Sequence, residues 1–415
     1  MTARAAPARI VVVRHGETGA NRAGLWQGAT DTELSDDGRD QVRRLGEVIA
    51  ADPPDLVVSS DLGRAVSTAE ALGLPFETDP RWREADLGVW EGRPFDEIMR
   101  SHADDLAALA RGDDIALGGG ERISGVAERT TDAFEQLAGR VGPGGTAVVV
   151  SHGVAIVTLV SSVVGIARPA PLRLMANTGI GAFSVGARGV QLLSYNDTAH
   201  LDDDPPRRPG DTDLVLIRHG ETSANVEQRW QGHGDWPLNE VGLAQAADAA
   251  VGVPRLDALY TSPLLRALHT AEAIGEAQRL TPEVVDDLKE IGFGAWENLT
   301  TGEIAAASPE QWGRLMAGED IVRGGHGETF AGARERMTAA IDGIAASHPE
   351  QVVGVVSHGT ATSAYVTGLL GLGFADRPRL HSLANTALGR VAFTSRGPTV
   401  VSWNTGRHLA AARRR

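Results

Sequence analysis

The stretch VVVRHGETGAN (residues 11–21) decides the interpretation of this chain, because it returns as VLIRHGETSAN (residues 215–225). In both copies an apolar run leads directly into an Arg-His pair, and an Asn follows six residues after the His, at Asn21 and Asn225. A His at the end of a buried strand can present an unprotonated nitrogen to phosphorus. The adjacent Arg can neutralise phosphate oxygens, and the Asn can donate a further hydrogen bond. The stretch therefore indicates phosphoryl transfer through a phosphohistidine, with nucleophiles at His15 and His219.

The repeat extends over the whole chain. Further pairs of stretches follow in the same order and at nearly the same offset: SSDLGRAVSTAEAL and TSPLLRALHTAEAI, WREADLGVWEG and LKEIGFGAWEN, VVVSHG and GVVSHG, ANTGI and ANTAL. Such ordered matches predict a tandem duplication. We expect a first domain over residues 1–201 and a second over residues 213–415. Residues 202–212, rich in Asp and Pro, are expected to form an exposed linker.

Within each half, short β-branched runs alternate with Ala-rich amphipathic stretches. The predicted strands are Arg9–Val13, Leu56–Val58, Thr146–Val150, Asp213–Ile217, Ala258–Tyr260 and Val352–Val356. The predicted helices include Arg39–Ala50, Gly63–Leu72, Ser124–Ala138 and the stretch after each Ser-His-Gly. This alternation predicts an α/β fold with two tandem three-layer α/β/α domains, each with a mostly parallel central sheet covered on both faces. Each candidate motif directly follows a strand, where open α/β sheets bind their ligands.

Composition excludes several function classes. The 415 residues include no Cys, so disulfides, thiol nucleophiles and thiolate metal sites are excluded, and the only lysine is Lys289. P-loop kinase and Schiff-base chemistry therefore have no suitable lysine. The net charge of −15 argues against nucleic acid or an anionic membrane as a partner. No signal-like or membrane-spanning run is present, so we expect a soluble, cytoplasmic protein whose partner is a small phosphorylated metabolite. Whether the chain forms a homo-oligomer stays open.

Two arginines are candidates for a phosphate clamp. Arg64 and Arg266 lie in the matched pattern Ser-x-x-x-Arg-Ala-x-x-Thr-Ala-Glu, just after a predicted strand and near a helix N-terminus. A guanidinium group beside helix-end amides can bind phosphate through two hydrogen bonds. The alternative is an ordinary surface Arg, and the retained pattern around both residues disfavours it.

The late histidines His152 and His358 follow a strand and open a Gly-containing turn. A second imidazolium there would hold the transferring phosphoryl group and stabilise its charge. The alternative is a buried or helix-capping His, with Ser151 or Ser357 as the N-cap. His200 and His408 end the two repeats and are interpreted as structural. No carboxylate or His cluster with metal-ligand spacing repeats in both halves, so no metal site is expected.

The proton donor is the least determined group. A carboxylic acid near the leaving oxygen can protonate it, and Glu84, Asp86 and Glu91 are close together in the first copy. Gly292 stands in the place of Asp86 in the second copy, so that acid is not needed at both sites. From spacing alone, Glu84 and Glu290 cannot be separated from Glu91 and Glu297.

These motifs resemble the histidine phosphatase superfamily, also called the phosphoglycerate mutase-like family, and the resemblance covers both halves almost end to end. It implies that the His of Arg-His-Gly is phosphorylated. It also implies a phosphate pocket completed by two arginines and the late His in each copy, which are Arg14, Arg64 and His152, and Arg218, Arg266 and His358. The first Glu of the Trp-Glu-containing motif is implied as the proton donor, at Glu84 and Glu290. Departures are mild: Trp82 replaces a Leu, Asn298 replaces a Gly, and Gly63 stands where the second copy has Leu265.

The resemblance implies ping-pong hydrolysis of a phosphate monoester at two active sites, without a metal or an organic cofactor. Two alternatives stay open. One is a phosphoglycerate-type phosphomutase, which the absence of a longer insertion in either unit disfavours. The other is that one repeat is a non-catalytic module that binds a phosphorylated ligand. The loops at residues 28–31 and 232–236 differ between copies, so the two sites are expected to prefer different substrates.

Overall fold

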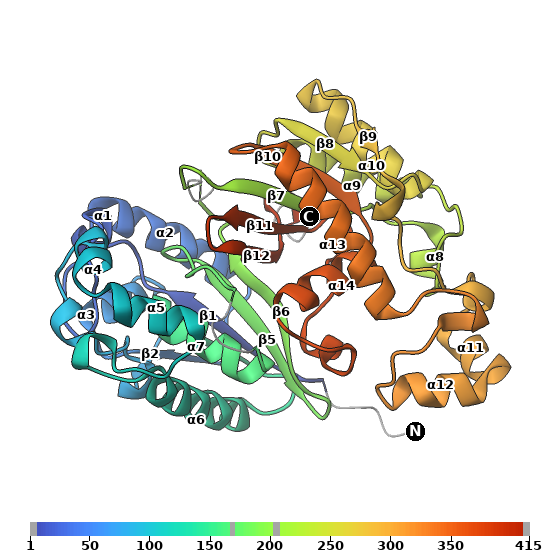
Figure 1. Ribbon diagram of the computed structural model, residues 1–415. Coiled ribbons are helices and arrows are strands. Elements are labelled where there is room, and N and C mark those ends of the chain that lie inside the picture. Colours follow the sequence, from blue (N-terminus) through green and yellow to red (C-terminus); the bar gives the residue numbers. More distant parts are fainter. Residues whose placement is uncertain (1–5, 167–170, 202–207, 410–415) are drawn as a thin grey trace. The chain divides into compact units, whose positions relative to one another are not determined.

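The computed structural model describes residues 6–166, 171–201 and 208–409 (Figure 1). The chain divides into two compact units, Met1–Pro205 and Pro206–Arg415. Most of the expected linker, residues 202–207, lies outside the described residues, and the first strand of unit 2 already begins at Thr212. No helix in the described ranges is long and apolar enough to cross a membrane.

Unit 1 alternates strands and helices along the chain. Its elements are β1 (Ala8–Arg14), α1 (Gly19–Arg22), α2 (Asp36–Ala51), β2 (Leu56–Ser59), α3 (Gly63–Glu70), β3 (Glu77–Thr78), η1 (Pro80–Trp82), η2 (Gly88–Trp90), α4 (Phe95–Ser101), α5 (Ala103–Arg111), η3 (Leu117–Gly119), α6 (Ile123–Val141), β4 (Thr146–Ser151), α7 (Gly153–Val164), β5 (Ile180–Gly186) and β6 (Gly189–Asp197).

Unit 2 repeats this order, and its described residues also include a 3-10 helix before the last two strands, where residues 167–170 of unit 1 are not described. Its elements are β7 (Thr212–Arg218), α8 (Ser223–Val226), α9 (Glu240–Gly252), β8 (Ala258–Thr261), α10 (Leu265–Gln278), β9 (Glu283–Val284), η4 (Asp286–Leu288), η5 (Gly294–Trp296), α11 (Thr301–Ala307), α12 (Pro309–Met316), η6 (Arg323–Gly325), α13 (Phe330–Ser347), β10 (Val352–Ser357), α14 (Gly359–Leu369), η7 (Phe374–Arg379), β11 (Leu388–Thr394) and β12 (Gly397–Thr405).

The sheet of each unit is mixed. In unit 1 the strands run β3-β2-β4-β1-β5-β6, with parallel pairing from β3 to β1 and antiparallel pairing from β1 to β6. Unit 2 has the corresponding order β9-β8-β10-β7-β11-β12. The predicted α/β class and all six predicted strands are confirmed, whereas the antiparallel pairs β5–β6 and β11–β12 are additions.

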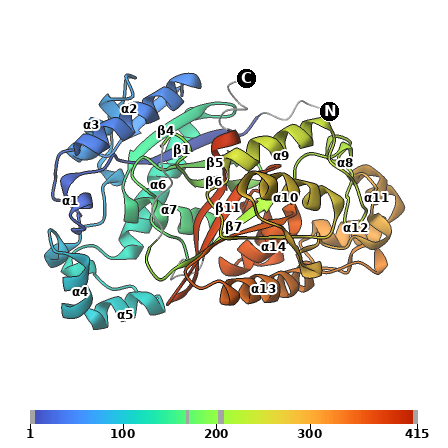
Figure 2. The same cartoon turned by 90° about the horizontal axis from the view of Figure 1, so that it is seen from above.

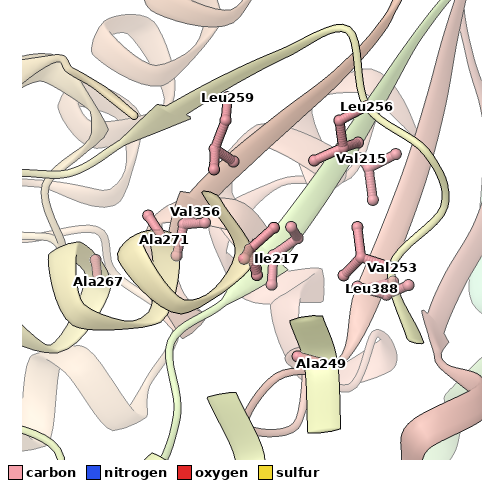
Figure 3. Packing of buried hydrophobic residues seen from close by; sticks show 11 residues of the cluster. Val215, Ile217, Ala249, Val253, Leu256, Leu259, Ala267, Ala271, Val356 and Leu388 are labelled. Atoms are coloured by element: carbon pink, nitrogen blue, oxygen red, sulfur yellow. The ribbon is translucent and has the colours of Figure 1, made fainter. Parts of the chain in front are cut away.

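Helices cover both faces of each sheet (Figure 2). In unit 1, α2 and α3 lie on one face and α6 and α7 on the other, and in unit 2 the corresponding pairs are α9 with α10 and α13 with α14. Successive side chains of a strand point to opposite faces, so the central strands β1 and β7 have apolar middle sections, residues 10–13 and 214–217. Figure 3 shows one such layer in unit 2, where Val215, Ile217 and Val356 of the sheet pack against Ala249, Ala267 and Ala271 of the helices.

Strand register brings the motifs together. The parallel pair β1–β4 ends with Arg14 opposite Ser151, so His15 and His152 follow directly at the same edge of the sheet. In unit 2 the pair β7–β10 ends with Arg218 opposite Ser357. The two histidines of each copy, far apart in sequence, thus meet at the carboxyl ends of neighbouring parallel strands.

Candidate active site

His15 lies one residue beyond β1 and is buried. Its Nδ1 is 2.7 Å from the carbonyl oxygen of Gly16, and because a carbonyl can only accept, Nδ1 carries the proton. The lone pair is therefore on Nε2, which can act as a nucleophile. His219 repeats this geometry with the carbonyl of Gly220, also at 2.7 Å. In both copies the backbone next to the His selects the tautomer.

Arg64 lies beside this nitrogen and is almost completely buried. Its Nε is 3.3 Å from Nε2 of His15. Its Nη1 and Nη2 donate to the carbonyl oxygens of Thr30 and Gly28 at 2.9 and 2.7 Å. The loop at residues 28–30 therefore fixes the guanidinium group next to the nucleophile before any ligand binds, which is the preorganisation that stabilisation of a phosphoryl group requires.

His152 is the N-cap residue of α7 and is completely buried. Its ring centroid lies 5.1 Å from that of His15, with the ring planes 56° apart. Its Nε2 is 2.8 Å from Oγ of Ser60, while its buried Nδ1 has no partner in the described ranges. The two predicted histidines are therefore neighbours, and one nitrogen of His152 is left for a ligand.

Glu84 reaches the same helix end. Its carboxylate accepts the backbone N–H groups of Val154 and Ala155, at 3.0 and 2.9 Å, and that of Ala85 at 3.0 Å. Free N–H groups and the helix dipole at an N-terminus both stabilise a carboxylate. Since His152 caps this helix, Glu84 and His152 are positioned by one element.

The other two candidate proton donors, Glu91 and Asp86, form hydrogen bonds with loop backbone groups. Glu91 accepts the backbone N–H groups of Ala29 and Thr30 at 2.8 and 2.9 Å, and so braces the loop that holds Arg64. Asp86 is exposed and accepts the N–H of Gly88 at 2.9 Å. These contacts favour Glu84 as the group closest to the histidine pair, a choice that spacing in the sequence left open.

The remaining predicted arginines have spare donors. Nη1 of Arg14 donates to the carbonyl of Met175, and Nη1 of Arg218 to that of Leu383, both at 2.7 Å. In each arginine the buried Nε has no partner in the described part of the chain. No group of three or more His, Asp or Glu side chains in the described ranges is placed to hold a metal ion.

Asn21 is engaged in local structure. Its Oδ1 accepts the N–H of Thr18 at 3.3 Å, in the capping box of α1, and Nδ2 of Asn177 at 3.1 Å. Asn177 also donates to the carbonyl of His15 at 3.0 Å. Asn225 has the same role in unit 2. The structure therefore places both asparagines as supports of the loop that carries the nucleophile.

The histidine pair of unit 2 differs in one contact. The centroids of His219 and His358 are 5.2 Å apart, and Nε2 of His358 is 2.8 Å from Oγ of Ser262. Nε of Arg266 donates to Nδ1 of His358, at 3.2 Å, rather than to the nucleophile. The buried guanidinium group thus contacts one imidazole of the pair in each unit, His15 in unit 1 and His358 in unit 2.

Glu290 repeats the setting of Glu84. It accepts the N–H groups of Thr360 and Ala361 at the start of α14, at 3.1 and 2.7 Å. Glu297 braces the loop at residues 232–234 through the N–H of His233 at 2.9 Å. Each predicted group of unit 1 therefore has its counterpart in unit 2.

Burial and positive neighbours set the protonation of the histidines. Desolvation, together with Arg14 and Arg64, holds the pKa of His15 well below its usual range. Desolvation and Arg64 do the same to the pKa of His152. The pKa values of His219 and His358 are lowered by burial and by Arg266. A neutral nucleophile agrees with its predicted role, but the imidazolium predicted for the late His is not favoured in the protein without a ligand.

Sequence reasoning missed three pairs of residues, two of which lie in the repeated motifs and one in the corresponding helices α6 and α13. They are Ser60 and Ser262, Asn177 and Asn385, and Arg129 and Arg336. Their corresponding positions in the two copies are the sequence signal that could have identified them. The sequence does not show what they bind, because each forms its hydrogen bonds with a residue distant in sequence.

Arg129 illustrates this. From α6, its Nη1 donates to the carbonyl oxygens of Arg81 and Arg83, both at 2.7 Å, and its Nη2 donates to that of Glu84 at 3.1 Å. Its Nε donates to the carboxylate of Glu121 at 2.8 Å. The guanidinium group therefore clamps the segment that carries Glu84.

We predict that stability falls as the pH drops below about 6.5, the ordinary pKa of His. Below that pH the histidines of the unfolded chain bind protons, whereas the buried histidines of the folded protein stay neutral. The free energy of unfolding therefore has its full value above about pH 6.5 and falls as the pH drops towards the lowered pKa values of the folded state. Each such histidine costs about 1.4 kcal/mol per pH unit. Burial lowers the pKa of His200 to about 4, which adds to the effect. Urea unfolding in phosphate-free buffer at pH 7.5 and 5.5 measures it, and equal stability at both values would contradict the prediction.

Comparison with known proteins supplies the family. The model of the histidine phosphatase superfamily (branch 1) matches residues 10–198 and again residues 214–406. A glucosyl-3-phosphoglycerate phosphatase of Mycolicibacterium vanbaalenii is 39% identical over 170 residues, 38% of this chain and 75% of the relative. A probable phosphoglycerate mutase of Yersinia pestis is 32% identical over 205 residues, 47% of this chain and 95% of the relative.

Two further matches also cover less than half of this chain. A mycobacterial glucosyl-3-phosphoglycerate phosphatase solved with VO3 is 31% identical and covers 46% of this chain and 98% of its own, with a TM-score of 0.43. An uncharacterized protein of Mycobacterium bovis is 38% identical over 173 residues, which are 41% of this chain. This match spans about half of that relative, 47% of its length.

Proposed function

The chain belongs to the histidine phosphatase superfamily, and from this premise we propose that it is a phosphomonoesterase that hydrolyses small phosphate esters through a phosphohistidine at two active sites. The observation that carries the proposal is the paired imidazoles, with centroids 5.1 Å apart in unit 1 and 5.2 Å apart in unit 2 and a buried guanidinium group in contact with one ring of each pair. A phosphoryl group placed there meets a nucleophile, two arginines and a second His.

In the first step, the lone pair on Nε2 of His15 attacks phosphorus as the bond to the ester oxygen breaks. Arg14 and Arg64 carry the charge on the equatorial oxygens, and Nδ1 of His152 faces them. The ester oxygen leaves with a proton from the carboxyl group of Glu84. The alcohol departs and His15 holds the phosphoryl group.

In the second step, a water molecule takes the place of the alcohol. The carboxylate of Glu84 removes its proton as the oxygen attacks phosphorus and the N–P bond breaks. Inorganic phosphate leaves, and both residues return to their starting forms. The same sequence applies to His219 and Glu290 in unit 2. All of these steps use side chains alone, so we propose that neither site needs a metal or an organic cofactor.

The relatives support a small phosphorylated metabolite as substrate, since one is named for a sugar-linked phosphoglycerate and another is a probable phosphoglycerate mutase. The second name keeps the phosphomutase alternative in view. A mutase would return the phosphoryl group to another hydroxyl instead of passing it to water.

The test is phosphate release from p-nitrophenyl phosphate, with EDTA present and no bisphosphate added. We expect steady turnover at a rate that EDTA leaves unchanged. A strict mutase would release almost no phosphate, and an enzyme that stops in EDTA and recovers with a divalent cation would contradict the metal-free mechanism.

A further inference from the structure

The two pockets share their reacting groups but differ in charge at one rim position. We propose that the site of unit 2 prefers esters whose alcohol part carries a second anionic group, and that the site of unit 1 prefers esters whose alcohol part is uncharged. This inference rests on the proposed function, since it names the substrate class of each site.

The difference begins in the loop that holds the phosphate arginine. In unit 2 the carbonyl oxygens of Gly232 and Gly234 accept Nη2 and Nη1 of Arg266, both at 2.8 Å. His233 lies between these two glycines, and its side chain is 43% exposed. Its Nε2 is 2.8 Å from the carbonyl oxygen of Glu290, the proposed proton donor. The imidazole therefore joins the phosphate clamp to the proton donor at the rim of the pocket.

The imidazole lies next to Gly292. A Cβ atom at Gly292 would lie 3.4 Å from Cε1 of His233, an ordinary van der Waals contact, so a side chain at this position would be a direct neighbour of the ring. Unit 1 has the inverse arrangement. Ala29 corresponds to His233, and Asp86, an exposed carboxylate, corresponds to Gly292. Compared with unit 1, unit 2 therefore lacks the negative charge of Asp86 and has the imidazole of His233, a group that can carry a positive charge.

A second difference between the units lies nearby. Arg323 of unit 2 is buried, and its Nη1 donates to the carbonyl oxygen of Glu328 at 3.0 Å and to the carboxylate of Asp320 at 3.3 Å. Its charge is therefore paired with Asp320, so the difference in charge between the two sites comes from the first exchange. Unit 1 has buried Leu117 at this position, and its nearby Arg122 is exposed.

We expect the exchange of Ala29 and Asp86 for His233 and Gly292 to decide which leaving group each site favours. Every substrate carries a phosphate dianion, and the arginines that both sites share bind it. A further carboxylate or phosphate on the alcohol is repelled by Asp86 in unit 1, whereas in unit 2 the corresponding Gly292 carries no charge and the imidazole of His233 lies beside it. One charge at the distance of a small metabolite changes binding by roughly fivefold or more at a partly solvated site.

The test compares each site alone. The variant H219A leaves unit 1 active and H15A leaves unit 2 active. The probes are 3-phosphoglycerate and glycerol 3-phosphate, which differ only in a carboxylate against a hydroxymethyl group. Phosphoserine against phosphoethanolamine is a second pair, and a bisphosphate against a monophosphate of the same sugar separates phosphate from carboxylate. We expect the kcat/KM ratio, anionic over uncharged, to be roughly fivefold or more higher for unit 2.

Exchange variants then locate the cause. Ala29→His with Asp86→Gly in the H219A background should raise the ratio by roughly fivefold, and His233→Ala with Gly292→Asp in the H15A background should lower it. A ratio is independent of the fraction of folded enzyme, so partial misfolding does not imitate the effect. Val251→Ala, at an 87% exposed position of unit 2, is the matched control.

The outcomes are distinct. Equal ratios in the two single-site enzymes, or ratios that the exchanges leave unchanged, would overturn this inference while turnover of p-nitrophenyl phosphate keeps the proposed function in place. If neither single-site enzyme released phosphate from any ester, the proposed function would fail and this inference with it.

Discussion

Replacing both nucleophiles, in the variant His15→Ala/His219→Ala, should lower phosphate release at least about 10⁴-fold, as expected when a covalent nucleophile is removed. Alanine leaves no lone pair at the position of Nε2. The arginines still bind the phosphate group, so ligand affinity should fall far less than kcat. Steady-state rates with p-nitrophenyl phosphate, together with binding of vanadate or inorganic phosphate, separate these two effects.

The single variants assign activity to each unit. We expect His15→Ala and His219→Ala each to keep the activity of the other site, so the two residual rates should sum to that of the unchanged protein. The exposed residue His381 provides the control, because His381→Ala should leave the rate unchanged. If one single variant kept full activity on every substrate tried, its unit would be the non-catalytic module of the alternative hypothesis.

A chemical trap tests the covalent intermediate itself. Rapid acid-free denaturation during turnover of a ³²P-labelled ester should leave label on the protein that is stable to base and released by acid, as for a phosphorylated imidazole. The double variant should carry none. Label of equal amount on the double variant would show that neither histidine is the nucleophile.

The second large effect concerns the proton donor. Glu84→Gln, made in the His219→Ala background, should slow hydrolysis of an alkyl phosphate by roughly 10²- to 10⁴-fold, the usual contribution of general acid catalysis. The amide retains an oxygen for the N–H groups at the start of α7 but has no carboxyl proton to give. p-Nitrophenolate leaves readily without protonation, so release from p-nitrophenyl phosphate should fall much less. The ratio of the two rates is the measurement.

The matched control is Glu91→Gln in the same background. Glu91 holds the loop at residues 28–30 through backbone N–H groups, so its loss should disturb Arg64 and slow both substrates by a similar factor. A leaving-group dependence in Glu91→Gln but not in Glu84→Gln would reverse the assignment. Glu290→Gln and Glu297→Gln in the His15→Ala background repeat the comparison in unit 2.

Much of the fold could be predicted because its signals are local. The strand β1 is an unbroken apolar run, and such runs are typical of a parallel strand buried on both faces. The antiparallel strands β5 and β6 escaped prediction because glycines, serines and other polar residues interrupt their apolar runs, and their burial follows no regular alternation. Their place in the sheet depends on pairing with β1, which no local pattern reveals.

The site shows the same division. His15 and His152 could be named from sequence because a His directly after a buried strand has few structural explanations when it recurs with its flanks. The choice of Glu84 over Glu91 depends on which backbone N–H groups each carboxylate accepts, and those belong to α7 and to the loop at residues 28–30. The imidazolium expected for the late His stays a prediction about the ligand-bound site, because burial and Arg64 lower the pKa of His152 in the protein without a ligand.

The sequence by itself determined the duplication, the α/β class and the residue types gathered at two pockets, since repeats and apolar runs are properties of order along the chain. Only the tertiary structure decided what each of those residues contacts. It placed the ring proton of His15 on Nδ1, made Asn21 a loop support and revealed Arg129 as the clamp on the segment that carries Glu84. It also brought His233 next to Gly292. The physical reason is that hydrogen bonds, desolvation and free space arise between groups distant in sequence, and they exist only once the sheet has brought those groups together.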